Sequence, residues 1–186
     1  MKATAGLEFI PIGQTTPEIQ ESVRASRNLP QVREHMYTDH EITPEEHARW
    51  LSSLEKNATT QVFIVIRNGA AIGLVSLTRI SPQHQTADWA FYLHPETQGS
   101  GLGVAIEFAL LEHAFHAVGL KKLNCEVLET NPGVIKLHKK FGFQEEGVRR
   151  QNIVKNNIRI GVFLLGMTAD EWEAQRDRFA RIVERM

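Results

Sequence analysis

Three glycines stand at every second position of the segment Gln98-Gly99-Ser100-Gly101-Leu102-Gly103. Without side chains in the way, backbone N–H groups can converge on one ligand, and a helix that begins here adds the positive end of its dipole. The segment therefore suits a phosphate or pyrophosphate group. Two familiar phosphate motifs do not fit, because a dinucleotide fingerprint would need glycine at Val104 and no Lys-Ser/Thr pair follows to make a P-loop.

Regular elements on both sides are predicted to hold this loop in place. A strand over residues 86–93 leads into it, and apolar residues at helical spacing predict a single long helix after it. The apolar stripe of this helix comprises Val104, Phe108, Leu111, Phe115 and Val118. Gly119 ends the helix, and residues 123–128 predict a strand. Asn131-Pro132 then begins a short helix that ends at Phe141-Gly142-Phe143.

Capping and turn signals predict the remaining elements. They are a strand at 7–12, a helix over 16–28, a helix from Thr43, a strand at 62–66 with a hairpin turn at 68–69, a hairpin turn at 155–157 and a C-terminal helix from Thr168. The last helix is charged nearly all round, so it is expected to be a solvated lid or a packing element rather than part of the site.

This order of elements, together with the pattern Gln-x-x-Gly-x-Gly in the loop, resembles the GNAT N-acetyltransferases. The resemblance implies one domain over residues 1–186 with an α/β (α+β) fold. Its mixed, mostly antiparallel twisted sheet of about seven strands would be flanked by helices and splayed between the fourth and fifth core strands.

The same resemblance implies acetyl-CoA as co-substrate. Its pyrophosphate would lie on the glycine loop and its pantetheine arm along the central strand. The cofactor-binding residues expected on this basis are Phe91, Tyr92, Leu93, Gln98, Gly99, Ser100, Gly101, Leu102, Gly103, Val104 and Asn131. Asn131 is equally compatible with a simple role as helix cap.

Acetyl transfer to an amine requires a proton acceptor for the ammonium and benefits from a proton donor for the leaving thiolate. In the family the donor is a tyrosine in the pattern Leu-Tyr-x-Lys-x-Gly-Phe, whereas this chain has histidine, His138, at the matching position. His138 is thus the candidate general acid, unless it is an ordinary surface residue of a basic helix. Asp88 on the central strand is the candidate base. Glu126 on the next strand competes with it, and either could act through water.

The first half of the chain carries a more specific resemblance. Arg27-Asn28-x-Pro30-x-Val32, Met36-Tyr37 and Ile42-Thr43-x-Glu45-Glu46-His47-x-x-Trp50 resemble the pseudaminic-acid-pathway UDP-amino-sugar N-acetyltransferases. That subfamily acetylates the 4-amino group of UDP-4-amino-4,6-dideoxy-N-acetyl-altrosamine. The residues expected to contact such an acceptor are Arg27, Met36, Tyr37, His47, Trp50 and Arg79. Arginines would bind the diphosphate and the other side chains would cover the sugar, although Met36 and Trp50 also suit core positions.

Two other functions stay open. The second half also resembles polyamine and ribosomal-protein N-terminal acetyltransferases. A polyamine enzyme would line its pocket with carboxylates, and candidates are Glu34, Asp39, Glu41, Glu45 and Glu46. The other function is a non-catalytic acyl-CoA sensor, in which His138 would mark lost chemistry.

Composition and charge narrow the choice further. The 186 residues carry a formal net charge of -1, so no global positive field favours nucleic acid or an anionic membrane. No apolar run approaches the ~20 residues of a membrane span, and the single cysteine, Cys125, allows no intrachain disulfide, so a cytoplasmic protein is expected. His113 and His116 are spaced like a metal pair but are expected to be solvated, so no metal is predicted. The oligomeric state stays open, with a homodimer as one option.

Overall fold

The computed structural model describes residue 1 and residues 4–186, and its elements follow the predicted order. The strands are β1 (Glu8–Pro11), β2 (Gln61–Arg67), β3 (Ala70–Ser81), β4 (Thr86–Leu93), β5 (Lys122–Leu128), β6 (Gln144–Lys155) and β7 (Ile158–Thr168). The α-helices are α1 (Pro17–Asn28), α2 (Pro30–Arg33), α3 (Pro44–Leu54), α4 (Leu102–Glu112), α5 (Pro132–Phe141) and α6 (Ala169–Val183). Short turns are a 3-10 turn at Ile12–Gln14, another at Pro95–Thr97, and a π-helical turn at His113–Ala117. No helix in the described ranges combines the length and the apolar character of a bilayer-spanning segment.

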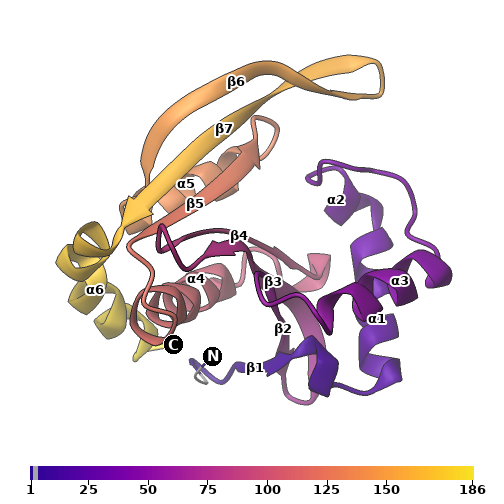
Figure 1. Ribbon diagram of the computed structural model, residues 1–186, viewed down its shortest axis with the longest axis horizontal. Coiled ribbons are helices and arrows are strands. Elements are labelled where there is room, and N and C mark those ends of the chain that lie inside the picture. Colours follow the sequence, from indigo (N-terminus) through magenta and orange to yellow (C-terminus); the bar gives the residue numbers. More distant parts are fainter. Residues whose placement is uncertain (2–3) are drawn as a thin grey trace.

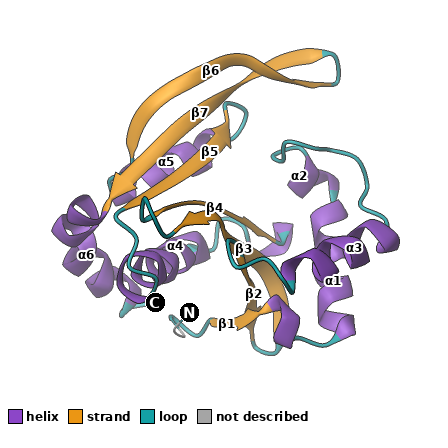
Figure 2. Ribbon diagram, viewed as in Figure 1, coloured by secondary structure: helices purple, strands orange, loops and turns teal. Residues whose placement is uncertain are grey.

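The strands form one sheet in the order β1-β2-β3-β4-β5-β7-β6, with helices on both sides of it (Figure 1; Figure 2). Neighbouring strands are antiparallel except β4 and β5, which run parallel. This parallel pairing joins only residues 86–88 to residues 122–124. Beyond it the two strands diverge, so in the part of the chain that the structure describes the end of β4 has no partner on β5. The predicted mixed sheet with a splay between its fourth and fifth strands is confirmed.

Strand β2 is buried on both faces. Ile64 and Ile66 belong to a core cluster that also contains Val23 of α1. Phe63 and Val65 belong instead to the main core cluster, which contains the buried residues of α4, α5 and α6. Successive side chains of a strand point to opposite faces, so a strand covered on both faces is apolar throughout. This position explains the uninterrupted apolar run of β2.

Helix α4 departs from the sequence prediction in two ways. It is regular only to Glu112 and continues as a π-helical turn, so the single long α-helix does not form. Its buried surface is also wider than the predicted stripe. The buried residues of α4 are Leu102, Ala105, Ile106, Glu107, Ala109, Leu110 and Leu111. Val104 and Phe108 of the predicted stripe are only partly buried. The buried surface of α4 is wide because α6 packs on this helix in addition to the sheet. One contact between the two helices is that of Phe108 with Trp172, edge-on with 5.7 Å between ring centroids.

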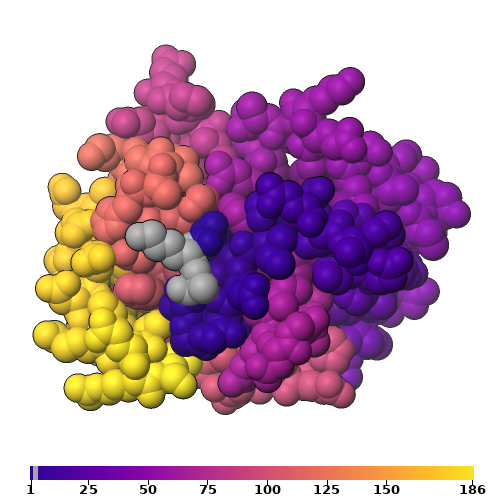
Figure 3. All heavy atoms as spheres, turned by 90° about the horizontal axis from the view of Figure 1, so that it is seen from below, coloured from indigo at the N-terminus to yellow at the C-terminus, as the bar shows by residue number. Residues whose placement is uncertain are grey.

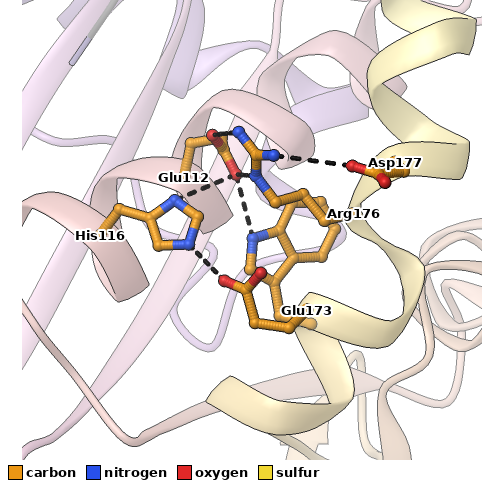
Figure 4. Close-up of polar contacts among 6 residues, drawn as sticks. Glu112, His116, Glu173, Arg176 and Asp177 are labelled. Atoms are coloured by element: carbon orange, nitrogen blue, oxygen red, sulfur yellow. Dashed lines mark hydrogen bonds and ion pairs between the residues drawn. The ribbon is translucent and has the colours of Figure 1, made fainter.

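A polar cluster ties α4 to α6 (Figure 4). The Glu112 carboxylate accepts a hydrogen bond from Trp172 Nε1 at 3.1 Å and two from Arg176 at 2.9 and 3.0 Å. His116 pairs with Glu112 at 3.3 Å and also with Glu173. Helix α6 is therefore a packing element, and it lies beside the N-terminal segment on one face of the molecule (Figure 3).

The two histidines predicted to be solvated have different environments. His116 is exposed, as expected. The prediction for His113 is wrong, because its Nε2 lies 2.7 Å from Gln61 Oε1 and its ring meets Phe63 edge-on at 5.2 Å between centroids. Burial lowers the pKa of His113 to about 4. Among the described residues, no group of three or more His, Cys, Asp or Glu side chains is arranged to hold a metal ion.

Strands β6 and β7 form an arm that rises above β5 and extends toward α2 (Figure 1). Lys155 attaches the tip of this arm to the N-terminal half. Its buried Nζ donates to the carbonyl of Arg33 at 2.8 Å and to that of Glu34 at 3.1 Å. These hydrogen bonds connect Lys155 with the end of α2, where Arg33 lies 122 positions earlier in the sequence.

Candidate active site

A cleft of about 770 Å³ opens where β4 and β5 separate. Its walls come from the segment after α1, from β3, β4 and β5, from the glycine loop and from α5. The predicted site residues that line it are Met36, Tyr37, Arg79, Asp88, Phe91, Tyr92, Leu93, Gln98, Gly99, Gly101, Gly103, Val104, Asn131 and His138. The structure therefore brings together most of the predicted cofactor residues and both predicted catalytic residues.

The glycine loop forms an open backbone cradle at the start of α4. Gly101 is the N-cap and has a φ of 83°, in the left-handed region that favours glycine, and its first N–H groups have no side-chain cap. A Cβ added at Gly103 would lie 3.2 Å from Leu137 Cδ2, so α5 packs closely against this turn. Uncapped N–H groups at the positive end of a helix suit a pyrophosphate. The loop thus fits that part of acetyl-CoA.

Three predicted cofactor residues also have structural roles. Ser100 donates a hydrogen bond to the Thr97 carbonyl, and Leu102 is buried in the main core, so neither is part of the cleft lining. Asn131 lines the cleft and also accepts a hydrogen bond from the Val134 backbone N–H at 3.3 Å. It therefore caps α5 and also faces the cleft, and its contact with the cofactor stays a prediction.

The end of β4 offers a main-chain edge to the cleft. On one side Phe91, Tyr92 and Leu93 pair with β3, while on the other side the described part of β5 has already diverged. An extended arm such as pantetheine can bind such an edge through main-chain hydrogen bonds. The Leu93 carbonyl accepts from Gln98 Nε2 at 3.3 Å, which ties the loop to the strand. The Tyr92 hydroxyl donates to the Val23 carbonyl at 3.2 Å, and burial raises the pKa of Tyr92.

His138 is not a surface residue of a basic helix. It is 2% exposed, and its Nδ1 lies 3.0 Å from Oε1 of Glu107, which is 0% exposed. Its ring meets that of Trp89 edge-on, with 4.9 Å between centroids. Because His138 also lines the cleft, the structure holds a fixed imidazole at the wall of the candidate site.

Asp88 and Glu126 lie on the two strands that separate at the cleft, and both line it. Asp88 forms an ion pair with Arg79. Glu126 accepts a hydrogen bond from Arg149 at 2.7 Å and another from the Tyr37 hydroxyl. Burial alone would raise the pKa of Glu126, but these two bonds hold it below the ordinary value. Burial and the bond to Glu126 raise the pKa of Tyr37 to about 12. Glu126 is therefore an ionised carboxylate that links the N-terminal half to the arm.

Three predicted acceptor residues, Arg27, His47 and Trp50, lie outside the described lining of the cleft. Arg27 donates to the Thr38 carbonyl at 3.0 Å, and burial lowers the pKa of its guanidinium. His47 is buried and stacks on Trp50 with 5.4 Å between centroids. Trp50 in turn packs against the core cluster that contains α1 residues. The placement of His47 and Trp50 reflects the packing of α3 against α1, which turns this face of the helix away from the cleft.

Sequence reasoning missed Glu107, Cys125 and Arg149. Glu107 carried a usable signal, because it is the one charged residue in the apolar stretch 102–111, and a charge in such a helix needs a partner when buried. Cys125 lines the cleft but had no motif around it. Arg149 meets Glu126 only because β7 pairs with both β5 and β6, which no local pattern indicates.

Comparison with known proteins gives consistent results. Residues 15–144 match the model of the family described as acetyltransferase (GNAT) domain. The spermidine N(1)-acetyltransferase of Escherichia coli (strain K12) is 33% identical over 106 residues, which cover 54% of this chain and 57% of that protein. Acetyltransferase PseH of Campylobacter jejuni is 26% identical over 117 residues, which cover 63% of this chain and 71% of that protein. The chain spans about half the length of the spermidine acetyltransferases that it matches.

Among solved structures, the crystal structure of spermidine N-acetyltransferase from Vibrio cholerae in complex with CoA and spermine is similar with a TM-score of 0.84. The match covers 91% of this chain and 99% of that chain at 20% sequence identity, so it shows the fold alone. The family model covers well over half of the chain, and the matched residues include the glycine loop and β4, which line the cleft. The chain belongs to the acetyltransferase (GNAT) domain family.

Proposed function

We propose that the chain transfers the acetyl group of acetyl-CoA to the primary amine of a nucleotide-linked amino-deoxy sugar. The resemblance of its first half implies the 4-amino group of UDP-4-amino-4,6-dideoxy-N-acetyl-altrosamine. The observation that supports the proposal most directly is the charge of the part of the cleft that would bind the acceptor. Asp88 and Glu126, the carboxylates that line the described cleft, are each paired with an arginine.

These ion pairs favour an acceptor that is not a polycation. A polyamine carries several ammonium groups, and a site for it requires carboxylates that are free to pair with them. Arg79 and Arg149 already neutralise the two acids. The Arg79 side chain is 73% exposed and that of Arg149 is about half exposed, so both retain donors for a diphosphate. Tyr37 adds aromatic surface for the apolar face of a deoxy sugar.

In the proposed reaction the chain supplies two proton transfers. Acetyl-CoA, when bound, supplies the activated acetyl group as a thioester. Asp88, or Glu126 through a water molecule, would accept a proton from the ammonium of the acceptor, and His138 would donate a proton to the leaving thiolate. The separation of β4 and β5 supports this assignment, because all three side chains line the opening that it creates.

Polyamine acetylation is the second candidate. It is favoured by the relatives named spermidine N(1)-acetyltransferase and by exposed acids that follow α2. These acids are Glu34, Asp39 and Glu41. They lie in the same segment as Met36 and Tyr37, which line the cleft, so they could add negative charge at its rim.

A thiol-release assay with acetyl-CoA and a panel of amines separates the two candidates. The panel contains UDP-linked amino sugars, spermidine and N-terminal peptides of ribosomal proteins. Acetylation of a UDP-amino sugar with no turnover of spermidine is the expected result. Turnover of spermidine but of no UDP-amino sugar would overturn the proposal.

Arginine variants add a test in which the two candidates predict opposite signs. If the acceptor is a nucleotide sugar, Arg79→Ala and Arg149→Ala should each raise its KM, by about 10–100-fold for a lost charge-assisted phosphate contact. If the acceptor is a polyamine, each variant frees a carboxylate and should lower the KM for spermidine. Arg67→Ala, at the exposed end of β2, is the matched control and should change neither KM.

A further inference from the structure

A buried acid lies directly behind the candidate general acid. Glu107 of α4 and His138 of α5 are 0% and 2% exposed, and Oε1 of Glu107 lies 3.0 Å from Nδ1 of His138. Buried charged groups are rare in proteins unless they are paired, and a helix such as α4 gains nothing from an acid at this position by propensity alone. The pair therefore calls for an explanation beyond packing.

We propose that Glu107 is a positioning residue that holds His138 with Nε2 toward the cleft and keeps a proton on that nitrogen. The inference rests on the proposed role of His138 as general acid, and it does not depend on the identity of the acceptor amine.

The geometry determines which nitrogen of His138 can face the cleft. Nδ1 is in contact with Glu107, so Nε2 is the nitrogen that can reach a ligand. Three aromatic rings limit rotation of the imidazole: Trp89 at 4.9 Å, Phe143 at 5.4 Å and Phe91 at 6.2 Å between centroids. An imidazole held by one carboxylate and packed between rings has a single orientation, which is the requirement for directed proton transfer.

The charge of the pair explains why the proton stays. A carboxylate together with an imidazole that has its hydrogen on Nδ1 alone carries one negative charge, and one further proton makes the pair neutral. In the neutral pair Nε2 carries a hydrogen whether the proton between the two side chains lies on Glu107 or on Nδ1 of His138. Loss of that proton would leave a net negative charge among apolar side chains, which is costly. Burial accordingly raises the pKa of the Glu107 carboxyl, although His138 beside it acts in the opposite direction.

The titratable neighbour that β5 contributes to this pair is the Cys125 thiol. Burial, followed by the negative charge of Glu107, raises the pKa of Cys125 well above the ordinary value. The thiol is therefore neutral. From β4 the rings of Trp89 and Phe91 face the imidazole, and so does the ring of Phe143, which lies between α5 and β6.

The proposed step balances in atoms and charge. A carbon–nitrogen bond to the amine forms, the carbon–sulfur bond breaks, and the sulfur takes the electron pair. Nε2 of His138 gives its proton to that sulfur. Of the two protons that the ammonium loses, one restores the pair of Glu107 and His138 and the other is released to solvent.

The test is Glu107→Gln, which keeps the size and hydrogen-bonding capacity of the side chain but removes its charge. Single-turnover acetyl transfer should slow by about 10²-fold, with acetyl-CoA affinity unchanged. The fall in rate at high pH should move to lower pH, because the pair has lost the carboxylate that retains its shared proton. Glu112→Gln is the matched control, since it removes a carboxylate from the same helix outside the cleft and should leave rate and pH profile unchanged.

A double-mutant cycle separates positioning from a structural role. In the His138→Phe background no acid remains, so Glu107→Gln should slow the reaction no further. An equal slowing in both backgrounds, or a normal rate and pH profile for Glu107→Gln when His138→Phe is slow, would overturn the inference. If His138→Phe itself runs at the wild-type rate, the proposed role of His138 fails instead.

Nitrogen-15 spectra of the wild-type imidazole provide a readout that needs neither substrate nor variant. We expect Nε2 of His138 to be protonated over the whole pH range in which the enzyme is active. A bare Nε2 with a proton on Nδ1 in that range would overturn the inference, even if Glu107→Gln did not fold.

Discussion

Replacing Gly101 by glutamate should abolish acetyl-CoA binding without unfolding the protein. Gly101 has a φ of 83°, and a residue with a side chain in this conformation costs about 1–2 kcal/mol. The nearest atom to an added Cβ is Met186 Cε at 3.7 Å, an ordinary contact, so no steric penalty adds to the strain. For a chain of this length the strain corresponds to a fall in Tm of about 2–8 °C.

The loss of binding should be much larger than this strain. A carboxylate at Gly101 would lie at the N-terminus of α4 and occupy the N–H groups that fit the pyrophosphate. Two like charges about 4 Å apart repel by about 1 kcal/mol in water and by about 4 kcal/mol near a protein surface. A loss of about 3 kcal/mol, or more than 100-fold in Kd, is therefore expected.

Calorimetric titration of CoA measures this effect, and two controls isolate its cause. Gly69 has a φ of 78° and open space around it in the β2–β3 turn, so Gly69→Glu should lower Tm by a similar amount and leave CoA affinity intact. Acetyl-pantetheine lacks the pyrophosphate, so its affinity should be the same for both variants and the wild type. A folded Gly101→Glu protein that binds CoA as tightly as the wild type would remove the glycine loop from the cofactor site.

Three further outcomes are expected. Lys155→Met removes the two hydrogen bonds to the end of α2. The free energy of unfolding should fall by about 1.5–3 kcal/mol and hydrogen exchange in α2 should rise, with CoA affinity unchanged. Unaltered exchange would mean that these bonds do not hold α2. Gly73→Ala would place a Cβ 2.3 Å from the Tyr92 carbonyl oxygen and should lower the free energy of unfolding by about 1–3 kcal/mol, whereas Gly13→Ala, with nothing within 4 Å, should not; equal urea midpoints for the two variants would contradict the close approach of β3 and β4. Burial lowers the pKa of His113 to about 4, below the ordinary value of about 6.5. As pH falls, the unfolded chain therefore binds this proton before the folded chain does. The contribution of His113 to stability is complete above pH ~6.5 and is lost as pH falls toward ~4. Urea denaturation at neutral and at acidic pH measures this loss of stability, and in His113→Gln the loss should be smaller by about 1–3 kcal/mol. An equal loss in the variant and the wild type would show that His113 does not cause it.

The elements of the fold could be predicted because their signals are local. Thr43 and Thr168 form complete capping boxes at the starts of α3 and α6, and the turn at 68–69 joins β2 to β3 as expected. The glycine loop was recognisable for the same reason. Its function depends on backbone conformation, and glycine at Gly101 is what a left-handed N-cap requires.

The site beyond the loop could be predicted only in part. The type and position of His138 were evident from its motif, but its partner Glu107 lies 31 residues earlier and meets it only when α4 and α5 pack together. Tyr37 and Glu126 are 89 residues apart, and they meet across the opening between the N-terminal half and β5. Such contacts depend on how elements are placed in space, so no window of sequence contains them.

By itself, then, the sequence determined the order of the elements, the glycine loop and the candidate acid, because each depends on residues close together along the chain. The tertiary structure alone decided which side chains face the cleft. Trp50 and Met36 were equally compatible with core and with acceptor contact, and the structure separates them, with Trp50 in the core and Met36 in the cleft wall. The physical reason is that an apolar helix or loop residue is buried equally well by a neighbouring helix or by a ligand, and only the packing of α3 against α1 determines which surface is left open.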